Sequence, residues 1–324
     1  MSTSSNSTFY DPIPFECDLS YDPFIEIIKY VIQLIYLLLG ALLMAHMLYI
    51  MLMKYRSNYI TNSYYQIFIF DLITSLYLTI HDMLFGRLTV YITPLCPIIG
   101  PYFYNYSILQ KISHISVQFV RASKAVCQIF LTLNRLTCVI FPLSHAKHWG
   151  KHMTLVIIAN IILPFGAIWM LFISRVYATN DAGGFSLGYI RAIDWASLSR
   201  FQSTYLTISL LISTFNSIAT IYGLHMLSNR VKNVERMLCF ATFFITAGII
   251  FVASFQYIWV FCAYCNANWN GLYGLQPVSY DILNIGTPIM MLLVNKRLRS
   301  DMFPGFSREQ VTVVTSSVSN IPVS

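Results

Sequence analysis

The chain has 324 residues, of which 56% are hydrophobic and only 10% are charged, and its formal net charge is +7. Soluble domains usually carry about 25% charged residues, so this chain cannot cover a globule of its size with polar surface. An integral membrane protein is therefore predicted. In such a protein the basic charge indicates cytoplasmic loops rather than nucleic-acid binding.

Seven stretches of the sequence are long and apolar enough to cross a membrane, which takes about 20 helical residues. They cover residues 30–53, 64–85, 107–140, 153–174, 203–226, 238–262 and 276–294. Pro164 interrupts the fourth stretch, where neighbouring helices can satisfy the backbone group that it frees. The predicted fold class is an all-α membrane protein, built as a seven-transmembrane helix bundle.

The distribution of basic residues places the N-terminus outside, because cytoplasmic loops carry an excess of Lys and Arg. With that orientation the inner segments hold eleven basic residues and the outer segments five. The inner residues are Lys54, Arg56, Lys147, Lys151, Arg230, Lys232, Arg236, Lys296, Arg297, Arg299 and Arg308, and the outer residues are Lys29, Arg87, Arg175, Arg191 and Arg200. The two glycosylation sequons, at Asn6 and Asn105, fall on the same outer side.

The two ends of the chain differ in character from the bundle. Residues 1–26 hold five acidic residues, neither Lys nor Arg, and no signal-peptide pattern. The last 21 residues, 304–324, are rich in Ser and Thr and are expected to be disordered. We therefore expect an extracellular tail over 1–26, a transmembrane bundle over 27–303 and a cytoplasmic tail over 304–324.

Four of the seven cysteines lie on or near the predicted outer side, where disulfides persist. They are Cys17, Cys96, Cys262 and Cys265. Four cysteines allow three pairings, and the sequence does not choose among them. Free thiols in an apolar protein are the alternative. Cys262 and Cys265 form a CxxC pair, but no second pair accompanies it, so no metal site is predicted.

The third predicted span is the most polar of the seven. Its polar side chains share about 140° of one face when residues are placed at ~100° steps along a helix. These residues are Lys111, His114, Gln118, Arg121, Lys124, Gln128 and Arg135, while Ser123 and Asn134 fall opposite. A polar face of this kind is expected to look into the bundle. Lys124 and Arg121 lie ~16 Å and ~21 Å outward of Arg135, in the middle and outer third of the membrane.

Cations buried there need partners, because an isolated buried charge costs several kcal/mol. Three carboxylates lie in or near the predicted spans: Asp71, Asp82 and Asp281. One interpretation pairs Arg121 or Lys124 with Asp281 or Asp82 inside the bundle. The other has Arg121 or Lys124 bind an anionic group of a small-molecule ligand. The two are compatible if the ligand displaces the internal carboxylate.

The inner end of the third span reads LTLNRLTCVIFP over residues 131–142. Asn134-Arg135-Leu136, with Pro142 seven residues after the arginine, resembles the DRY-type motif of G-protein-coupled receptors. In that family the arginine contacts the G protein in the active state. The alternative for Arg135 is that its side chain extends to the inner headgroups of the bilayer. Asp71 resembles the family's sodium-binding aspartate in position; a carboxyl hydrogen-bonded to neighbouring helices is the alternative.

The end of the seventh span resembles the NPxxY region of the same family. Thr287-Pro288 stands in its place, which makes Pro288 a candidate conformational switch. Residues 295–303 resemble the short amphipathic eighth helix, with Leu298, Met302 and Phe303 expected to face lipid. The acidic residue of DRY, the tyrosine of NPxxY and the CWxP motif of the sixth span are all missing.

These departures suit a narrower family. The motif LNRLTCVIFP, the stretch GGFSLGYIRAIDWASLS over 183–199 and the ending TPIMMLLVNKRLRSDMF resemble the nematode serpentine chemoreceptors of class gamma (Srg). The resemblance covers roughly residues 25–303. It implies a chemosensory receptor for small environmental or pheromone molecules, located in the plasma or ciliary membrane of sensory neurons.

The resemblance also implies a heterotrimeric G protein as partner, with no cofactor, metal, nucleic acid or enzyme activity. The residues expected to engage the G protein are Asn134, Arg135, Arg230, Lys232 and Arg236. The candidates for binding a ligand, in the outer half of the bundle, are His114, Gln118, Arg121, Lys124 and Asp281. A transporter is the competing class, because it would use the charges of the third span as substrate or proton groups.

Overall fold

The computed structural model describes residues 12–13, 16–18, 20–103, 105, 107–181, 183–226, 243–244, 246–255, 257–258 and 270–304. Several predictions fall outside these residues and stay predictions. They concern Asn6, Arg230, Lys232, Arg236, Cys262, Cys265, both ends of the span 238–262 and the tail beyond residue 304.

Helices make up most of the described chain. Their order begins with α1 (Pro23–Tyr49), a π-helical turn (Ile50–Lys54), α2 (Arg56–Ile60), α3 (Ser63–His81), a second π-helical segment (Asp82–Arg87) and α4 (Leu88–Tyr91). Short turns follow at Thr93–Leu95, α5 (Cys96–Ile99) and Gly100–Phe103. The remaining elements are α6 (Ile108–Ile140), α7 (His145–Ile162), α8 (Phe165–Ile173), β1 (Arg175–Asp181), β2 (Gly184–Ile190), α9 (Leu198–Met226), α12 (Asn270–Val294) and α13 (Lys296–Met302).

Five helical segments in the described part of the chain are long and apolar enough to cross a membrane. They are Pro23–Lys54, Ser63–Tyr91, His145–Ile173, Leu198–Leu224 and Pro277–Val294, which coincide with predicted spans one, two, four, five and seven. The 33-residue helix α6 coincides with the third span but carries four basic residues, and a shorter apolar helix over Thr246–Phe255 lies within the sixth. The helical membrane fold is confirmed, while the count of seven spans and the orientation stay predictions.

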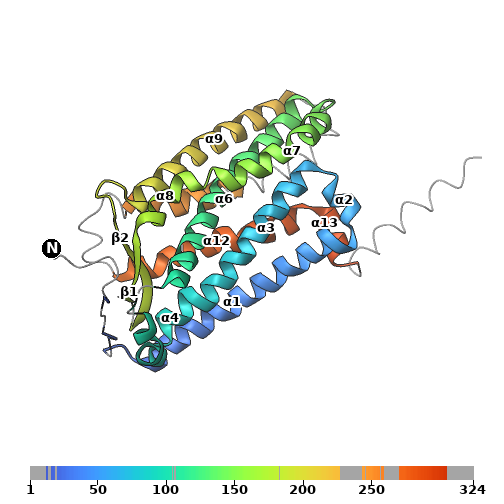
Figure 1. Cartoon of the computed structure of the whole chain (residues 1–324). Helices are drawn as coiled ribbons and strands as arrows, with labels where there is room; N and C mark the ends of the chain where they lie inside the picture. The colour runs from blue at the N-terminus through green and yellow to red at the C-terminus, as the bar shows by residue number, and fades with distance from the viewer. Residues whose placement is uncertain are drawn as a thin grey trace, which may run out of the picture.

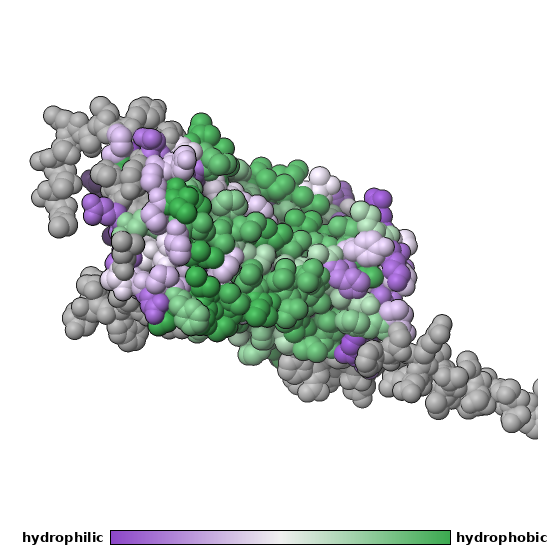
Figure 2. All heavy atoms as spheres, turned by 90° about the horizontal axis from the view of Figure 1, so that it is seen from below, coloured by the Kyte–Doolittle hydropathy of each residue, from purple (hydrophilic) through white to green (hydrophobic). Residues whose placement is uncertain are grey.

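The helices lie side by side in an elongated bundle (Figure 1). The hairpin of β1 and β2 covers one end, and α2 and α13 lie at the other. Figure 2 shows a broad hydrophobic band across the middle of one face, with hydrophilic residues gathered toward the two ends. Large apolar side chains such as Leu39, Leu42, Leu211 and Phe215 are exposed along the helices. This pattern suits a surface that faces hydrocarbon rather than water.

The β-hairpin was not predicted from the sequence. Its antiparallel register runs from Arg175 opposite Ile190 to Asp181 opposite Gly184. Gly183 closes the turn at φ 81°, a left-handed conformation that favours glycine. At Gly184 a Cβ would lie 2.1 Å from the carbonyl oxygen of Thr89, so glycine also lets the hairpin pack directly on α4.

One disulfide ties the N-terminal segment to this end of the bundle. Cys17 is bonded to Cys96, and the pair packs beside Ala178 and Phe185 of the hairpin. The pairing that the sequence left open is thereby settled for these two cysteines. Asn105 is exposed.

Helix α1 packs closely on α12 because Gly40 has no side chain. A Cβ at Gly40 would lie 2.8 Å from Cδ1 and 2.9 Å from Cγ1 of Ile285, which is closer than carbon atoms pack. By contrast, a Cβ at Gly150 of α7 would meet nothing within 4 Å.

Replacing each glycine with alanine is expected to have opposite effects on stability. Gly150→Ala is expected to raise the thermal midpoint, since alanine favours a helix by up to about 1 kcal/mol over glycine. Gly40→Ala is expected to lower it, with overpacking costs of about 1–3 kcal/mol. Thermal unfolding of the detergent-solubilised protein measures both, and a stabilised Gly40→Ala variant would contradict the close contact.

Candidate functional site

Helix α6 lies among α3, α7, α8 and α9 and carries many of the buried polar side chains of the bundle. Gln118, Lys124, Gln128 and Arg135 of the predicted polar face are buried, and so are Ser123 and Asn134 on the opposite side. Ser123 donates a hydrogen bond to the carbonyl of Asn160 at 3.1 Å, and Asn134 donates one to Ser63 at 2.9 Å. Both side chains are buried, because helices surround α6 on several sides.

Lys124 forms the deepest ion pair of α6. Its ammonium donates to Asp71 Oδ1 at 3.0 Å and to Ser75 Oγ at 2.5 Å. Only 5% of the Lys124 side chain and 7% of the Asp71 side chain are exposed. The expectation that Lys124 would pair with Asp281 or Asp82 is therefore wrong, because both Asp71 and Ser75 lie on α3 directly beside α6. The Lys124 ammonium thus takes the place beside Asp71 Oδ1 that a sodium ion would need.

Asp281 of α12 has a partner that the sequence did not suggest. Arg87, which ends the second π-helical segment, is paired with Asp281. The same guanidinium donates to Gln33 Oε1 at 2.9 Å and to the Tyr36 hydroxyl at 2.6 Å, both on α1. Sequence reasoning had counted Arg87 among the cations of an outer loop.

The helix continues past the predicted end of the second span, which explains why Arg87 was missed. Residues 82–87 read DMLFGR, and the apolar run between the aspartate and the arginine was a signal of continued burial. The result is a cluster that ties α1, the π-helical segment and α12 together at the hairpin side of the bundle.

Arg121 is held more loosely than the other two cations. Its guanidinium lies 3.9 Å from Asp82 Oδ1, beyond hydrogen-bonding distance, and it donates no hydrogen bond to a described residue. It stacks on the ring of Tyr280 at 4.4 Å. Its side chain is 21% exposed. The predicted pair between Arg121 and Asp82 is thus present, but its geometry is poor.

The other ligand candidates of α6 lie around Arg121 on the same half of the helix. Gln118 accepts a hydrogen bond at 2.6 Å from Gln202 of α9. The ring of His114 lies 6.3 Å from that of Tyr189 in the hairpin. His114, Gln118 and Arg121 are therefore brought toward one region, whereas Lys124 and Asp281 are engaged in tight pairs of their own.

A small cavity adjoins Arg121 between α6, α9, the Thr246–Phe255 helix and α12. Its lining residues are Arg121, Ala122, Lys124, Ala125, Gln202, Tyr205, Leu206, Ile249, Val252, Tyr280 and Leu283. Its volume of about 20 Å³ holds about one water molecule. A ligand would need the helices to separate before it could enter.

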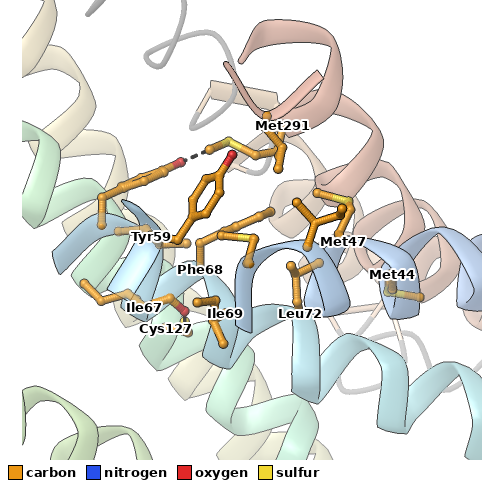
Figure 3. Packing of buried hydrophobic residues seen from close by; sticks show 14 of the residues in the cluster. Met44, Met47, Tyr59, Ile67, Phe68, Ile69, Leu72, Cys127 and Met291 are labelled. Carbon is orange, nitrogen blue, oxygen red and sulfur yellow. Dashed lines mark hydrogen bonds between the residues drawn. The ribbon is translucent and has the colours of Figure 1, made fainter. Parts of the chain in front are cut away.

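Arg135 lies at the opposite end of α6 from the hairpin. Its guanidinium carbon is 3.6 Å from the centre of the Tyr64 ring on α3, and the residue is buried. The Tyr64 hydroxyl in turn donates to Met291 Sδ of α12 at 3.6 Å (Figure 3, dashed line). Arg135 therefore lies within the bundle rather than extending to the headgroups, and it is linked to α12 three residues beyond Pro288.

The eighth helix is present as α13, but its apolar side does not face lipid as predicted. Leu298 and Met302 are buried in a hydrophobic cluster. The same cluster holds Met47, Phe68 and Met291, which are labelled in Figure 3. Only Phe303 is substantially exposed. The error arose because hydropathy does not distinguish burial against lipid from burial against α1 and α3.

Polar contacts hold α13 against the inner end of the bundle. The Tyr59 hydroxyl donates to Asp301 Oδ2 at 2.6 Å, and Asn295 donates to the Tyr65 hydroxyl at 2.5 Å. Burial, followed by the hydrogen bond and charge of Asp301, raises the pKa of Tyr59 above its usual value. The phenol therefore stays protonated and remains a donor at physiological pH.

Removing the Lys124 ammonium is expected to make stability depend on sodium. Lys124→Ala leaves the Asp71 carboxylate buried without its cation, which typically costs about 3–5 kcal/mol. Sodium can then partly replace the ammonium. We expect the thermal midpoint of the variant, but not of the native chain, to rise when choline chloride is exchanged for sodium chloride at constant ionic strength.

Asp71→Asn provides the control for that experiment, because it removes the anion that sodium would neutralise. Combined with Lys124→Ala, it is expected to abolish the sodium response. An equal sodium response in the native chain would show that Lys124 does not supply the cation at Asp71.

Comparison with known proteins identifies the family. Residues 30–302 match the family model described as Srg family chemoreceptor. Serpentine receptor class gamma-13 of Caenorhabditis elegans is 36% identical over 323 residues, which is 99% of this chain and 96% of that protein. Serpentine receptor class gamma-5 of the same organism is 38% identical over 301 residues, which is 93% of each.

These relatives are receptors, which confirms the expectation that the chain is not an enzyme and disfavours the transporter alternative. Together with the apolar helices, they make the chain a multi-pass membrane protein of chemosensory type. This chain belongs to the Srg family of serpentine chemoreceptors.

Proposed function

We propose that this chemoreceptor binds a small anionic molecule through Arg121 and signals to a heterotrimeric G protein through the Arg135 end of α6. The observation that carries the ligand proposal is the loose pairing of Arg121. Among Arg87, Arg121 and Lys124, only Arg121 has its carboxylate partner beyond hydrogen-bonding distance.

A carboxylate, sulfate or phosphate group of a ligand can accept the hydrogen bonds that Arg121 does not make with Asp82. Planar guanidinium groups bind such anions through two parallel hydrogen bonds, which are shorter and stronger than a contact at 3.9 Å. Lys124 lacks this opportunity, because Asp71 and Ser75 already take its hydrogen bonds at 3.0 and 2.5 Å. The structure therefore favours Arg121 over Lys124 as the anchor for a ligand.

If a ligand displaced Asp82 from Arg121, the π-helical segment Asp82–Arg87 would be free to move, and this segment connects the ligand region to α12. Asp82 begins the π-helical segment that Arg87 ends, and Arg87 is paired with Asp281 of α12. Pro288 lies seven residues further along the same helix, and proline is a common site of helix bending. We propose that this segment and Pro288 transmit the change to Met291, Tyr64 and Arg135.

At the inner end, the proposed response is the release of Arg135 from Tyr64. Arg135 and Asn134 would then become accessible to the G protein at the end of α6. The residues Arg230, Lys232 and Arg236, which lie outside the described chain, would add positive charge to the same surface and steer an acidic partner.

This mechanism needs the hairpin end of the bundle to lie outside the cell, and two features of that end support this orientation. The Cys17–Cys96 disulfide and the exposed Asn105 sequon lie toward the hairpin end, and disulfides form in oxidising compartments. We therefore propose an extracellular tail over 1–26, a bundle over 27–303 and a cytoplasmic tail over 304–324. The proposed location is the plasma or ciliary membrane of a sensory neuron.

The coupling role of Arg135 can be tested by nucleotide exchange on a co-expressed G protein. The probes are short-chain carboxylates together with their neutral amides. Arg135→Ala is expected to lower stimulated exchange at least tenfold while leaving ligand binding within a factor of three, because Arg135 is far from the ligand region. Lys151→Ala, which removes an exposed cation from α7, is the control and is expected to retain exchange.

A surface-expressed chain that binds a carboxylate yet stimulates no G protein would contradict the coupling proposal. Accumulation of the carboxylate inside vesicles without any G protein would instead support a transporter.

The anchoring role of Arg121 can be tested by binding alone. Arg121→Ala is expected to weaken carboxylate binding at least tenfold and to change amide binding little, because the lost interaction is ionic. Arg121→Lys is expected to recover only part of the affinity, since an ammonium cannot make the paired hydrogen bonds of a guanidinium. Arg200→Ala, at an exposed position of α9, is the matched control. Equal loss of carboxylate and amide binding would mean that Arg121 supports the fold rather than the ligand.

A further inference from the structure

A second hollow lies on the other side of α6, between that helix and α8. Its volume is about 530 Å³, within the range of about 300–1,000 Å³ typical of small-molecule sites. The cavity beside Arg121 is far smaller, at about 20 Å³. We propose that this groove binds a single-chain amphiphile with an anionic head, which enters from the membrane.

Two helical stripes form the walls of the groove. On α6 they are Ile108, Lys111, Ile112, Ile115, Ser116 and Phe119, and on α8 they are Phe165, Ile168 and Phe172. Residues three and four apart share one face of a helix, so each helix presents a continuous wall, which is apolar except for Lys111 and Ser116 of α6. Leu163 and Pro164 interrupt the helix between α7 and α8. Helix α8 is therefore a separate helix, and it packs beside α6.

The groove is open toward the surrounding membrane. Ile108, Ile112, Phe165 and Phe172 are all exposed in the protein, in the zone where the bundle would meet hydrocarbon. From Ile108 to Phe119 the α6 wall is ~16 Å long at 1.5 Å per residue. This is about half of the ~30 Å hydrocarbon core, so the groove suits one acyl chain within the leaflet on the hairpin side.

A positive charge near one end of the groove determines the head group. Lys111 lies one turn from the hairpin end of α6, and its ammonium donates to the carbonyl of Phe172 at 2.6 Å, across the mouth between the two helices. The rest of the lining is apolar apart from Ser116. An amphiphile with its carboxylate at Lys111 would lay ~12 Å of alkyl chain along the wall toward Phe119.

The remaining polar group of the lining is already engaged. Ser116 donates to the carbonyl of Ser113 at 2.8 Å and lies 2.6 Å from the Tyr77 hydroxyl of α3. The apolar part of the groove therefore has no polar group directed at a guest. A carboxylate with one saturated chain satisfies this arrangement, whereas a polar solute does not.

Photo-crosslinking on the full chain in nanodiscs of neutral phosphatidylcholine tests the proposal. The probe is dodecanoate with a diazirine near the end of its chain, and dodecanol with the same diazirine is the neutral match. Crosslinks to the carboxylate probe are expected within 108–119 and 165–172, with excess dodecanoate competing at least tenfold better than dodecanol.

Two variants separate the apolar wall from the charge. Ile112→Trp is expected to fill the groove and lower labelling at least tenfold, and Ile108→Trp serves as a second filling variant if the first yields no monodisperse protein. Lys111→Gln is expected to keep labelling but remove the preference for carboxylate over alcohol. Leu155→Trp, at an exposed position of α7, is the control and is expected to change nothing.

The outcomes also separate this site from the proposed ligand site. Labelling in the groove is expected to survive Arg121→Ala, because the groove lies on another side of α6. Labelling spread evenly over the exposed helices and unchanged in the filling variants would show ordinary lipid contact and overturn the proposal. Equal competition by dodecanoate and dodecanol in the native chain would overturn the charge recognition.

Discussion

Cations buried in a helix bundle must find partners, and this requirement organises the structure. In a medium that solvates charge poorly, an ammonium or guanidinium is tolerated only where a carboxylate and further hydrogen bonds receive it. Lys124 meets Asp71 and Ser75, joining α6 to α3. Arg87 meets Asp281, Gln33 and Tyr36, joining the segment after α3 to α12 and α1. These pairs specify which helices pack against one another. Apolar side chains do this poorly in a membrane, because they can pack equally well against lipid or against another helix.

The same requirement separates structural charges from the one suited to function. Arg121 has a carboxylate at 3.9 Å and an aromatic ring in place of close hydrogen bonds. The guanidinium of Arg121 can therefore gain hydrogen bonds if an anion of better geometry replaces Asp82. The cavity beside this group holds about 20 Å³, so a ligand could bind Arg121 only if the helices moved apart.

The sequence predicted the features that depend on hydropathy and helical period. The spans over 30–53, 64–85, 107–140, 153–174, 203–226 and 276–294 correspond to observed helical segments, since a run of apolar residues is a local property. The burial of Lys124 and Arg135 also followed from the polarity of the third span. The choice of partners did not, because pairing depends on how helices from distant parts of the chain rotate against one another. Asp281 was therefore recognised as a buried carboxylate but assigned to Arg121 or Lys124 instead of Arg87. Asp71 was recognised as a buried carboxylate but was not matched with Lys124.

Features that depend on tertiary packing or on backbone geometry were missed for similar reasons. The hairpin of β1 and β2 relies on Gly183 and Gly184 to turn tightly and to pack on α4, within a stretch that was interpreted only through its family resemblance. The inward side of α13 was assigned to lipid because Leu298 and Met302 are equally suited to either environment. Arg87 was assigned to a loop because the apolar run ahead of it was taken as the end of a span.

Three double-mutant cycles would measure how strongly each cation of the bundle is coupled to its carboxylate. The cycles pair Lys124→Ala with Asp71→Asn, Arg87→Ala with Asp281→Asn, and Arg121→Ala with Asp82→Asn, with thermal unfolding of the full chain as the measurement. The coupling energies of the first two cycles are expected to clearly exceed that of the third, with the Arg121 cycle below about 1 kcal/mol, as for weakly held ion pairs. A coupling between Arg121 and Asp82 as large as the other two would contradict the account, because Arg121 would then be as firmly committed to the fold as Lys124.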